Sequence, residues 1–96
     1  MQITRKHLKI KGKVQGVGFR QNAFILAQKL GLKGWVRNTH EGDVEVMIEG
    51  ESSTVALFEE WCHEGPIHSV VTSVNVLNSE NTSETIFLTF TIQKTN

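Results

Sequence analysis

The hydrophobic pattern of this chain changes from the period of a strand to the period of a helix across one glycine-rich segment, residues 12–20. Apolar side chains alternate with lysines over residues 8–14, as on a strand with one buried face. Over residues 19–30 they recur at helical spacing, and Gly31 follows as a C-terminal cap. The chain is therefore expected to form a strand, a tight glycine loop and a helix in direct succession.

The glycine loop has the composition of a phosphate-binding site. Gly16 and Gly18 permit positive φ and a close approach to a ligand, so several N–H groups at the start of a helix can point into one concavity. Arg20 adds a planar, permanently charged group that matches phosphate oxygens. A tight strand-to-helix turn followed by an ordinary exposed arginine is the alternative interpretation of these residues.

The rest of the chain continues to alternate between the two periods. We expect a hairpin with strands at residues 35–38 and 44–49, a second helix capped by Ser52 and Ser53 and ended by Gly65-Pro66, strands at residues 70–76 and 86–92, and a polar loop at residues 78–84. This order predicts the α+β class: a ferredoxin-like two-layer sandwich, βαββαβ plus a C-terminal strand, with two helices covering one face of a mainly antiparallel sheet. Ninety-six residues suit one domain, residues 1–96.

The formal net charge of zero conceals an asymmetry along the chain. Nine of the ten basic residues lie within residues 5–37, and all ten acidic residues lie within residues 41–84. A basic front half raises the local concentration of an anionic ligand. Alternatively, its lysines pair across strands with acidic residues, namely Lys9, Lys11 and Lys13 with Glu45 and Glu49. An RNA-binding module needs aromatic stacking platforms, and the chain has no tyrosine and few other aromatics, so no nucleic-acid partner is expected.

Cysteine and histidine usage indicates neither a disulfide nor a metal site. Cys62 is the single cysteine, and it falls on the apolar face of the second predicted helix, as expected of a buried structural thiol. The four histidines show no metal-ligand spacing, and His40 is expected to be a solvated hairpin residue. Without a membrane-spanning apolar segment or a signal-peptide core, we expect a cytoplasmic protein with no membrane partner.

Six motifs occur in a specific order along nearly the whole chain. They are Gly12-x-Val14-Gln15-Gly16-Val17-Gly18-Phe19-Arg20, Leu30-Gly31-Leu32-x-Gly34-Trp35-Val36-Arg37-Asn38, Glu41-Gly42-x-Val44-Glu45, Phe58-x-x-Trp61, Gly65-Pro66 and Phe90-x-Ile92. In these motifs the chain resembles the acylphosphatase family. Two departures stand out: Glu41 occupies a position where aspartate is commoner, and Gln21 one where an aromatic residue is frequent.

The resemblance implies hydrolysis of the carboxyl–phosphate bond of a small-molecule acyl phosphate, with no metal and no organic cofactor. It implies that the two catalytic residues are Arg20 and Asn38. It also implies that the substrate phosphate is bound by Arg20 and by the loop of Gln15, Gly16, Val17, Gly18 and Phe19. The resulting prediction is a monomeric hydrolase.

The chemistry of these residues agrees with that activity. An acyl phosphate already has a carboxylate leaving group, so phosphoryl transfer to water needs mainly charge neutralisation and a well-placed water. Asn38 cannot act as a base, but its amide can orient that water, and the proton would pass to a phosphoryl oxygen of the substrate. Strand alternation places Asn38 on the face of Val36 and opposite to Arg37, which is expected to be a surface charge. A non-catalytic phosphate- or anion-binding module and an RNA-binding module of the same fold remain the alternatives.

Overall fold

The computed structural model describes residues 2–96. Along the chain its elements are β1 (Ile3–Lys13), α1 (Phe19–Leu30), β2 (Lys33–Asn38), β3 (Val44–Gly50), α2 (Ser52–Glu64), β4 (Val70–Thr82) and β5 (Phe90–Ile92). The predicted order of strands and helices is confirmed. Neither helix has the length and apolar character needed to span a bilayer within the part of the chain that the structure describes.

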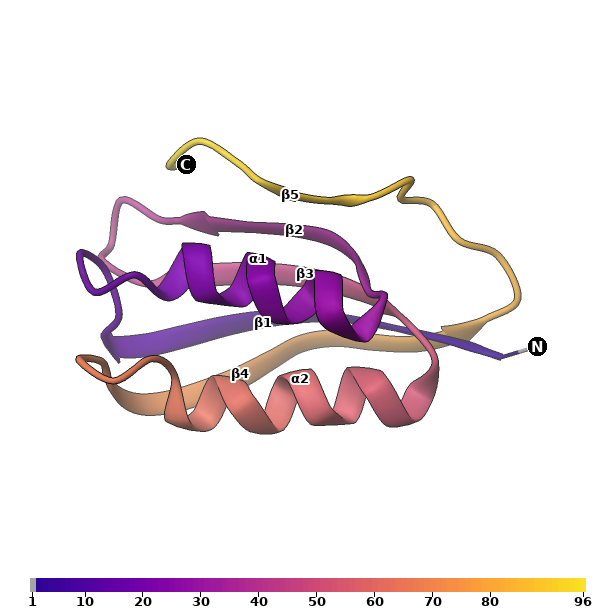
Figure 1. Cartoon of the computed structure of the whole chain (residues 1–96), viewed down its shortest axis with the longest axis horizontal. Coiled ribbons are helices and arrows are strands. Elements are labelled where there is room, and N and C mark those ends of the chain that lie inside the picture. The colour runs from indigo at the N-terminus through magenta and orange to yellow at the C-terminus, as the bar shows by residue number, and fades with distance from the viewer. Residues whose placement is uncertain (1) are drawn as a thin grey trace.

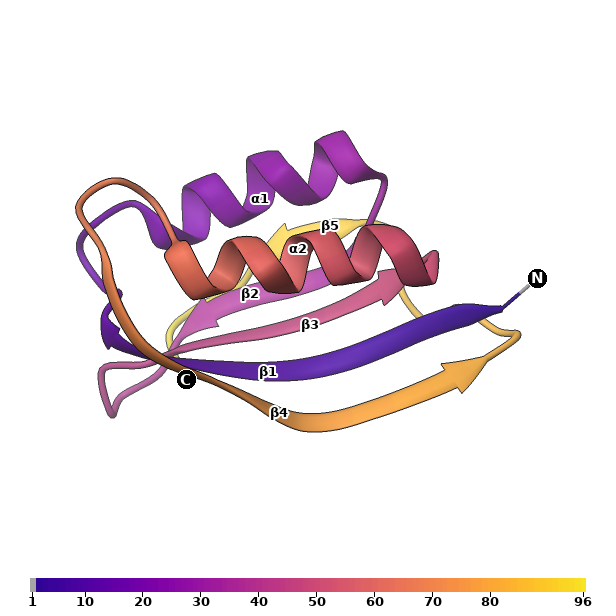
Figure 2. The same cartoon turned by 90° about the horizontal axis from the view of Figure 1, so that it is seen from below.

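The five strands form one sheet in the order β4-β1-β3-β2-β5. All neighbours are antiparallel except β5, which runs parallel to β2. Both helices lie on the same face of the sheet, which Figure 2 shows from its edge. This is the predicted two-layer α+β arrangement, with the additional C-terminal strand at one edge.

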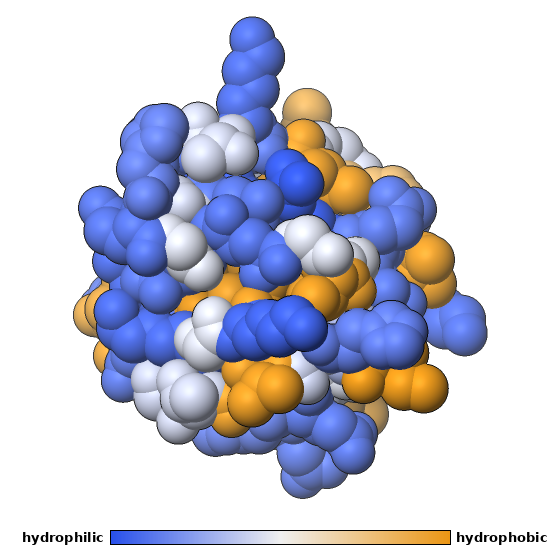
Figure 3. All heavy atoms as spheres, turned by 90° about the vertical axis from the view of Figure 1, so that its left-hand side faces the viewer, coloured by the Kyte–Doolittle hydropathy of each residue, from blue (hydrophilic) through white to orange (hydrophobic). Residues whose placement is uncertain are grey.

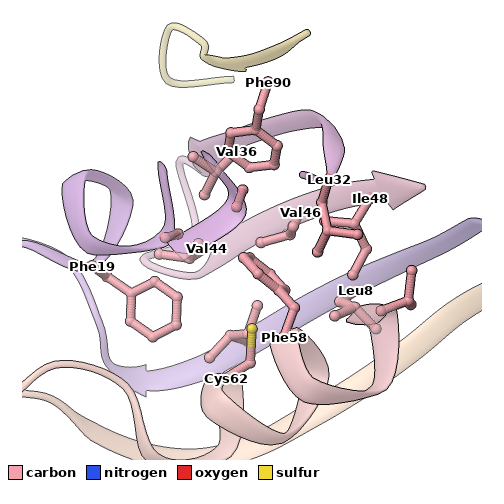
Figure 4. Close-up of a cluster of buried hydrophobic side chains, with 14 of the residues drawn as sticks. Leu8, Phe19, Leu32, Val36, Val44, Val46, Ile48, Phe58, Cys62 and Phe90 are labelled. Atoms are coloured by element: carbon pink, nitrogen blue, oxygen red, sulfur yellow. The ribbon is translucent and has the colours of Figure 1, made fainter. Parts of the chain in front are cut away.

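The hydrophobic core fills the space between the helices and the sheet (Figure 4). In the register of β1 with β3, Leu8 lies beside Val46 and Ile10 beside Val44, so that apolar side chains of both strands share the covered face. These four residues are fully buried. The 3.6-residue period of α1 buries Ala23 and Ala27 in the same core, and the helix packs against β2 and β5.

Three connections and the C-terminus gather at one end of the molecule, on the left of Figure 1. They are the β1–α1 loop, the β2–β3 turn and the α2–β4 connection. Seen from that end, the surface is mostly hydrophilic, with hydrophobic residues exposed between the polar ones (Figure 3). The antiparallel topology therefore brings the glycine loop and the end of β2 to the same end of the fold.

The last two strands differ from the prediction in their bounds. β4 continues to Thr82, through the segment expected to be a polar loop, because its main chain pairs with β1 as far as Ile3. Two register shifts in this pairing also change which residues face the core, so Val71 and Val74 pack there while Val70 is exposed. β5 is only three residues long, and the expected strand residues before Phe90 lie outside it.

The predicted cap of the second helix is also wrong. Glu51 is the N-cap residue, in an extended conformation with φ −62° and ψ 139°, and both Ser52 and Ser53 lie inside α2. The hydroxyl of Thr54 donates to the carbonyl oxygen of Glu51 at 2.8 Å, and Ser53 Oγ donates to Glu51 Oε1 at 2.7 Å. The helix therefore begins one residue earlier than the hydroxyl residues suggested.

Candidate active site

The β1–α1 loop takes the backbone conformation that its glycines permit. Gly16 has φ 73° and Gly18 has φ 81°, both in the left-handed region, and Gly18 is the N-cap of α1. A side chain at Gly16 would meet no atom within 4 Å, so it is the backbone angle that favours glycine there. Val14 and Phe19 are buried on either side and hold both ends of the loop to the core.

The start of α1 offers main-chain donors beside this loop. The first helical hydrogen bond runs from Asn22 N to Gly18 O at 3.0 Å, so the preceding N–H groups have no acceptor within the helix. Arg20 lies in this first turn, and none of the ion pairs recorded in residues 2–96 involves its guanidinium. Unpaired donors and a cation at a helix N-terminus form an electrostatic environment suited to an anion.

Asn38 is the last residue of β2, and its side chain lies on the helix-covered face as the alternation predicted. It is 9% exposed, on the same face as the fully buried Val36. Its carbonyl oxygen accepts a hydrogen bond from Asn96 N at 3.0 Å, and Gln93 N donates to Val36 O at 2.8 Å. Hydrogen bonds from the C-terminal segment thus hold the main chain of β2 in place as far as Asn38, the candidate catalytic residue.

Arg20 and Asn38 line one cavity. Its volume is about 280 Å³, and it is lined by Val14, Gly16, Gly18, Phe19, Arg20, Gln21, Asn38 and Ile92. The two residues come from α1 and β2, yet they share this space with the glycines of the loop. Val14, Gln21 and Ile92 were not predicted as site residues. Ile92 reaches the cavity because β5 pairs parallel to β2, with Val36 opposite Ile92 in the register.

A model of the acylphosphatase family matches residues 6–92. The chain belongs to the acylphosphatase family. It is 44% identical to an acylphosphatase of Roseiflexus sp. strain RS-1 over 84 residues, which cover 88% of this chain and 90% of that protein. It is 50% identical to an acylphosphatase of Marinobacter nauticus over 74 residues, 77% of this chain and 80% of that protein. The solved acylphosphatase of Coxiella burnetii superposes with a TM-score of 0.83 at 36% identity, covering 95% of this chain and 93% of that one.

Two loop residues of this acylphosphatase do not line the cavity. Val17 is partly buried and packs against the hydrophobic core. The side chain of Gln15 is directed elsewhere, because its Nε2 donates to the carbonyl oxygens of Thr39 and Asp43, each at 2.8 Å. For both residues, a contact with substrate through the main-chain amide stays a prediction.

Arg37 lies on the opposite face of the sheet from Asn38. Its Nε and Nη2 each lie 2.9 Å from Glu45 Oε1, and its guanidinium stacks 4.4 Å above the ring of Trp35. Glu45 also contacts His7, whose Nε2 lies 2.5 Å from Glu45 Oε2. Burial acts to raise the pKa of Glu45, but the hydrogen bonds and charges of His7 and Arg37 together hold that pKa below its ordinary value. Arg37 is therefore committed to this cluster rather than to the cavity.

In the basic front half of this acylphosphatase, four of the nine lysines and arginines form ion pairs with acidic residues. The expected cross-strand arrangement is confirmed for Lys9, which lies opposite Glu45 in the register of β1 with β3, but Glu49 binds Arg5 and Lys11 binds Asp43. The recorded ion pairs of the front half are Arg5 with Glu49 and Glu80, Lys6 with Glu59, His7 with Glu45, Lys11 with Asp43 and Arg37 with Glu45. These pairs reduce the positive field that an RNA-binding surface would need.

The remaining titratable candidates lie away from the cavity. Cys62 is fully buried in α2, and burial raises the pKa of its thiol above the ordinary range. His40 is exposed in the β2–β3 turn, where its main-chain N–H donates to Asn96 O at 2.9 Å. Within residues 2–96, no three His, Cys, Asp or Glu side chains gather as a metal site would require. The residues that line the cavity carry a guanidinium, side-chain amides and main-chain N–H groups, which are donors for an anion.

Proposed function

We propose that this acylphosphatase hydrolyses the carboxyl–phosphate bond of an acyl phosphate to a carboxylate and inorganic phosphate, with Arg20 and Asn38 as its catalytic residues. The observation that carries the proposal is their convergence on one cavity, together with Gly16, Gly18 and Phe19 of the loop. Membership of the family supports the reaction, and the geometry of the cavity supports the assignment of the two roles.

The loop and Arg20 bind the phosphoryl group of the substrate. The guanidinium provides a planar pair of donors for two phosphoryl oxygens, and the main-chain N–H groups of the loop donate to the others. The N-terminus of α1 adds its partial positive charge behind them. The main-chain donors are fixed by the loop and by the first turn of α1, so little reorganisation is needed as negative charge redistributes in the transition state.

Asn38 places the attacking water. Its side-chain amide can both accept and donate a hydrogen bond, which fixes a water in line with the bond to be broken. The water oxygen bonds to phosphorus while the bond from phosphorus to the acyl oxygen breaks, and the electron pair of that bond leaves with the carboxylate. The proton of the water passes to a phosphoryl oxygen of the substrate. A carboxylate is a stable leaving group, so the reaction requires no general acid at the leaving oxygen.

The decisive experiment compares acyl phosphates with phosphate monoesters. We expect rapid release of inorganic phosphate from benzoyl phosphate and acetyl phosphate, in the presence of EDTA, and no measurable release from p-nitrophenyl phosphate or a sugar phosphate. The reason is that an ester leaving group needs acid or metal assistance that Arg20 and Asn38 do not supply. Phosphate binding without turnover of either acyl phosphate would instead support a non-catalytic anion-binding module.

The proposal extends to a monomer that acts in the cytoplasm on small molecules. A single buried cysteine suits a reducing compartment. Size-exclusion chromatography with light scattering should give the mass of one chain, and activity per chain should not change on dilution. An activity that falls with dilution would show that the site needs a second copy.

A further inference from the structure

Gln15 connects the phosphate loop to the strand that carries Asn38. Its side-chain Nε2 donates one hydrogen bond to Thr39 O and one to Asp43 O, both at 2.8 Å. Thr39 directly follows Asn38, and Asp43 directly precedes β3, so the two acceptors begin and end the β2–β3 turn. One side chain at the start of the loop thus bridges both ends of the turn next to the catalytic asparagine.

The turn that Gln15 binds is itself well ordered by hydrogen bonds. Thr39 N donates to Asp43 O at 2.9 Å, and Gly42 N donates to Thr39 O at 3.2 Å. Asp43 N donates in addition to Thr39 Oγ1 at 3.1 Å. Thr39 and Asp43 are 4% and 7% exposed. Gln15 therefore binds the closed and buried base of the turn, through which a displacement of the loop would be transmitted to the end of β2.

The same contacts remove the side chain of Gln15 from the set of phosphate ligands. A side-chain amide has two N–H donors on its nitrogen, and both are directed at the turn. The remaining Oε1 is an acceptor, which an anionic phosphate repels. The side chain is also absent from the lining of the cavity. The sequence predicted Gln15 to be a substrate-binding residue, but its side chain binds the β2–β3 turn.

We infer that Gln15 is a positioning residue of this active site, whose side-chain amide sets the distance between the bound phosphoryl group and the water held by Asn38. The inference rests on the proposed function, in which the two halves of the site come from different elements: the loop and Arg20 from the β1–α1 segment, and Asn38 from β2. In-line attack requires these halves to be aligned. A misplacement of about 1 Å costs on the order of 100-fold in rate.

The test replaces the amide by a side chain of similar length without donors, Gln15→Met. We expect kcat for benzoyl phosphate to fall by about 10- to 100-fold, because alignment is lost. The inhibition constant of inorganic phosphate should stay within about twofold of the wild-type value, since the loop and Arg20 are intact. Asn22→Ala is the matched control: it removes an amide that donates to Gly18 O at 2.8 Å within the loop and helix, and kcat should change by less than about threefold.

A second variant, Gln15→Glu, keeps the inference testable if Gln15→Met does not fold. The introduced carboxylate faces two carbonyl oxygens, but its protonated form donates one hydrogen bond to them. Relative to the wild type at each pH, kcat of Gln15→Glu should therefore rise as the pH falls from 7 to 5. A purely structural role predicts a constant ratio wherever circular dichroism shows the variant to be folded.

Three outcomes would overturn the inference. The first is an inhibition constant for phosphate that rises as much as kcat/KM falls, which would make Gln15 a phosphate ligand. The second is a wild-type kcat in Gln15→Met. The third is a pH-independent ratio for Gln15→Glu. A wild-type protein that leaves benzoyl phosphate intact would overturn the proposed function as well, so the two failures are distinguishable.

Discussion

Single residues in this site act through placement more than through unusual chemistry. Arg20 is an arginine without a carboxylate partner among the recorded ion pairs of residues 2–96, and Asn38 is a neutral amide at the end of a strand. Either type is common on protein surfaces. What distinguishes these two is that they line the same cavity beside the unpaired donors of a helix N-terminus. Their proposed roles differ, so substitutions should separate binding from catalysis.

We expect Arg20→Ala to lower kcat/KM for benzoyl phosphate by more than about 1000-fold, because the variant loses a charged, bidentate donor to the phosphoryl group. Arg20→Lys should recover only part of this loss, since lysine is a point charge without the planar pair of donors. Inorganic phosphate should raise the melting temperature of the wild type and leave that of Arg20→Ala unchanged. Protection of Arg20→Ala by phosphate at the wild-type concentration would contradict the assignment.

Asn38→Ala should lower kcat by about 100-fold or more while the inhibition constant of phosphate changes by less than about threefold. The water loses its orientation, but the loop and Arg20 still bind the anion. Steady-state kinetics with phosphate as the competitive inhibitor give both quantities. If phosphate inhibition weakened in parallel with turnover, Asn38 would be a phosphate ligand instead of a residue that places water.

At the scale of elements, the site is built where the covered face of the sheet ends. The loop enters α1 through Gly18, and the same helix ends at Gly31, which has φ 69° and donates to Ala27 O and Gln28 O. Both ends of the helix thus use a glycine in the left-handed region, one beside the cavity and one remote from it. Substitution of these two glycines can therefore separate the effect of the left-handed backbone conformation on stability from its effect on catalysis.

Gly16→Ala and Gly31→Ala form a matched pair of variants. At both positions a new Cβ would meet no atom within 4 Å, and φ is 73° and 69°, so each change should lower the free energy of unfolding by about 1–2 kcal/mol. Only Gly16→Ala should reduce activity, by about tenfold or more, because its loop is the proposed binding site of the phosphoryl group. Urea unfolding and kcat/KM measure the two effects. Equal activity in both variants would show that the conformation of Gly16 is not used in catalysis.

At the scale of the whole molecule, the two faces of the sheet differ in their interactions: the helix-covered face is apolar and the opposite face carries ion pairs. The covered face holds the core and ends at Asn38. The opposite face carries the partly buried ion pairs of Glu45 with His7 and Arg37, and the buried ion pair of Glu49 with Arg5. The Glu49 carboxylate, which is 1% exposed, also accepts hydrogen bonds from the main-chain N–H groups of Ile86 and Phe87. These charges tie the connection between β4 and β5 to the sheet.

Acid should destabilise the fold in part through Glu45. Its pKa is lower in the folded chain than the ordinary value of 4.5, so its ionised form contributes stability above pH 4.5 that is lost as the pH falls through the folded pKa. We therefore expect the free energy of unfolding of Glu45→Gln, measured in urea between pH 6 and pH 3, to vary less with pH than that of the wild type. Glu41→Gln, at an exposed position in the β2–β3 turn, serves as the control and should keep the wild-type pH dependence. Parallel curves for Glu45→Gln and wild type would contradict the prediction.

The elements with one strongly buried face were predictable from the sequence alone. The strand-like alternation before Val14 and the helical period after Phe19 located the loop. Asn38 lies two residues after Val36 on the same strand, so its side chain was expected on the covered face. Arg20, Asn38 and the glycines were candidates because their motif is local, so their spacing along the chain already implies a loop and a helix start. Local sequence reports the period of burial, and burial on one face decides these elements.

The tertiary structure decided what depends on partners distant along the chain. β4 extends to Thr82 because its main chain pairs with that of β1. Main-chain hydrogen bonds do not require alternating apolar residues, so this part of the strand could not be recognised from the sequence. Ile92 reaches the cavity only through the parallel register of β5 with β2. Gln15 meets the carbonyl oxygens of Thr39 and Asp43 only because the sheet brings the loop and the turn to one end. Such contacts depend on register and topology, which the local period of the chain does not encode.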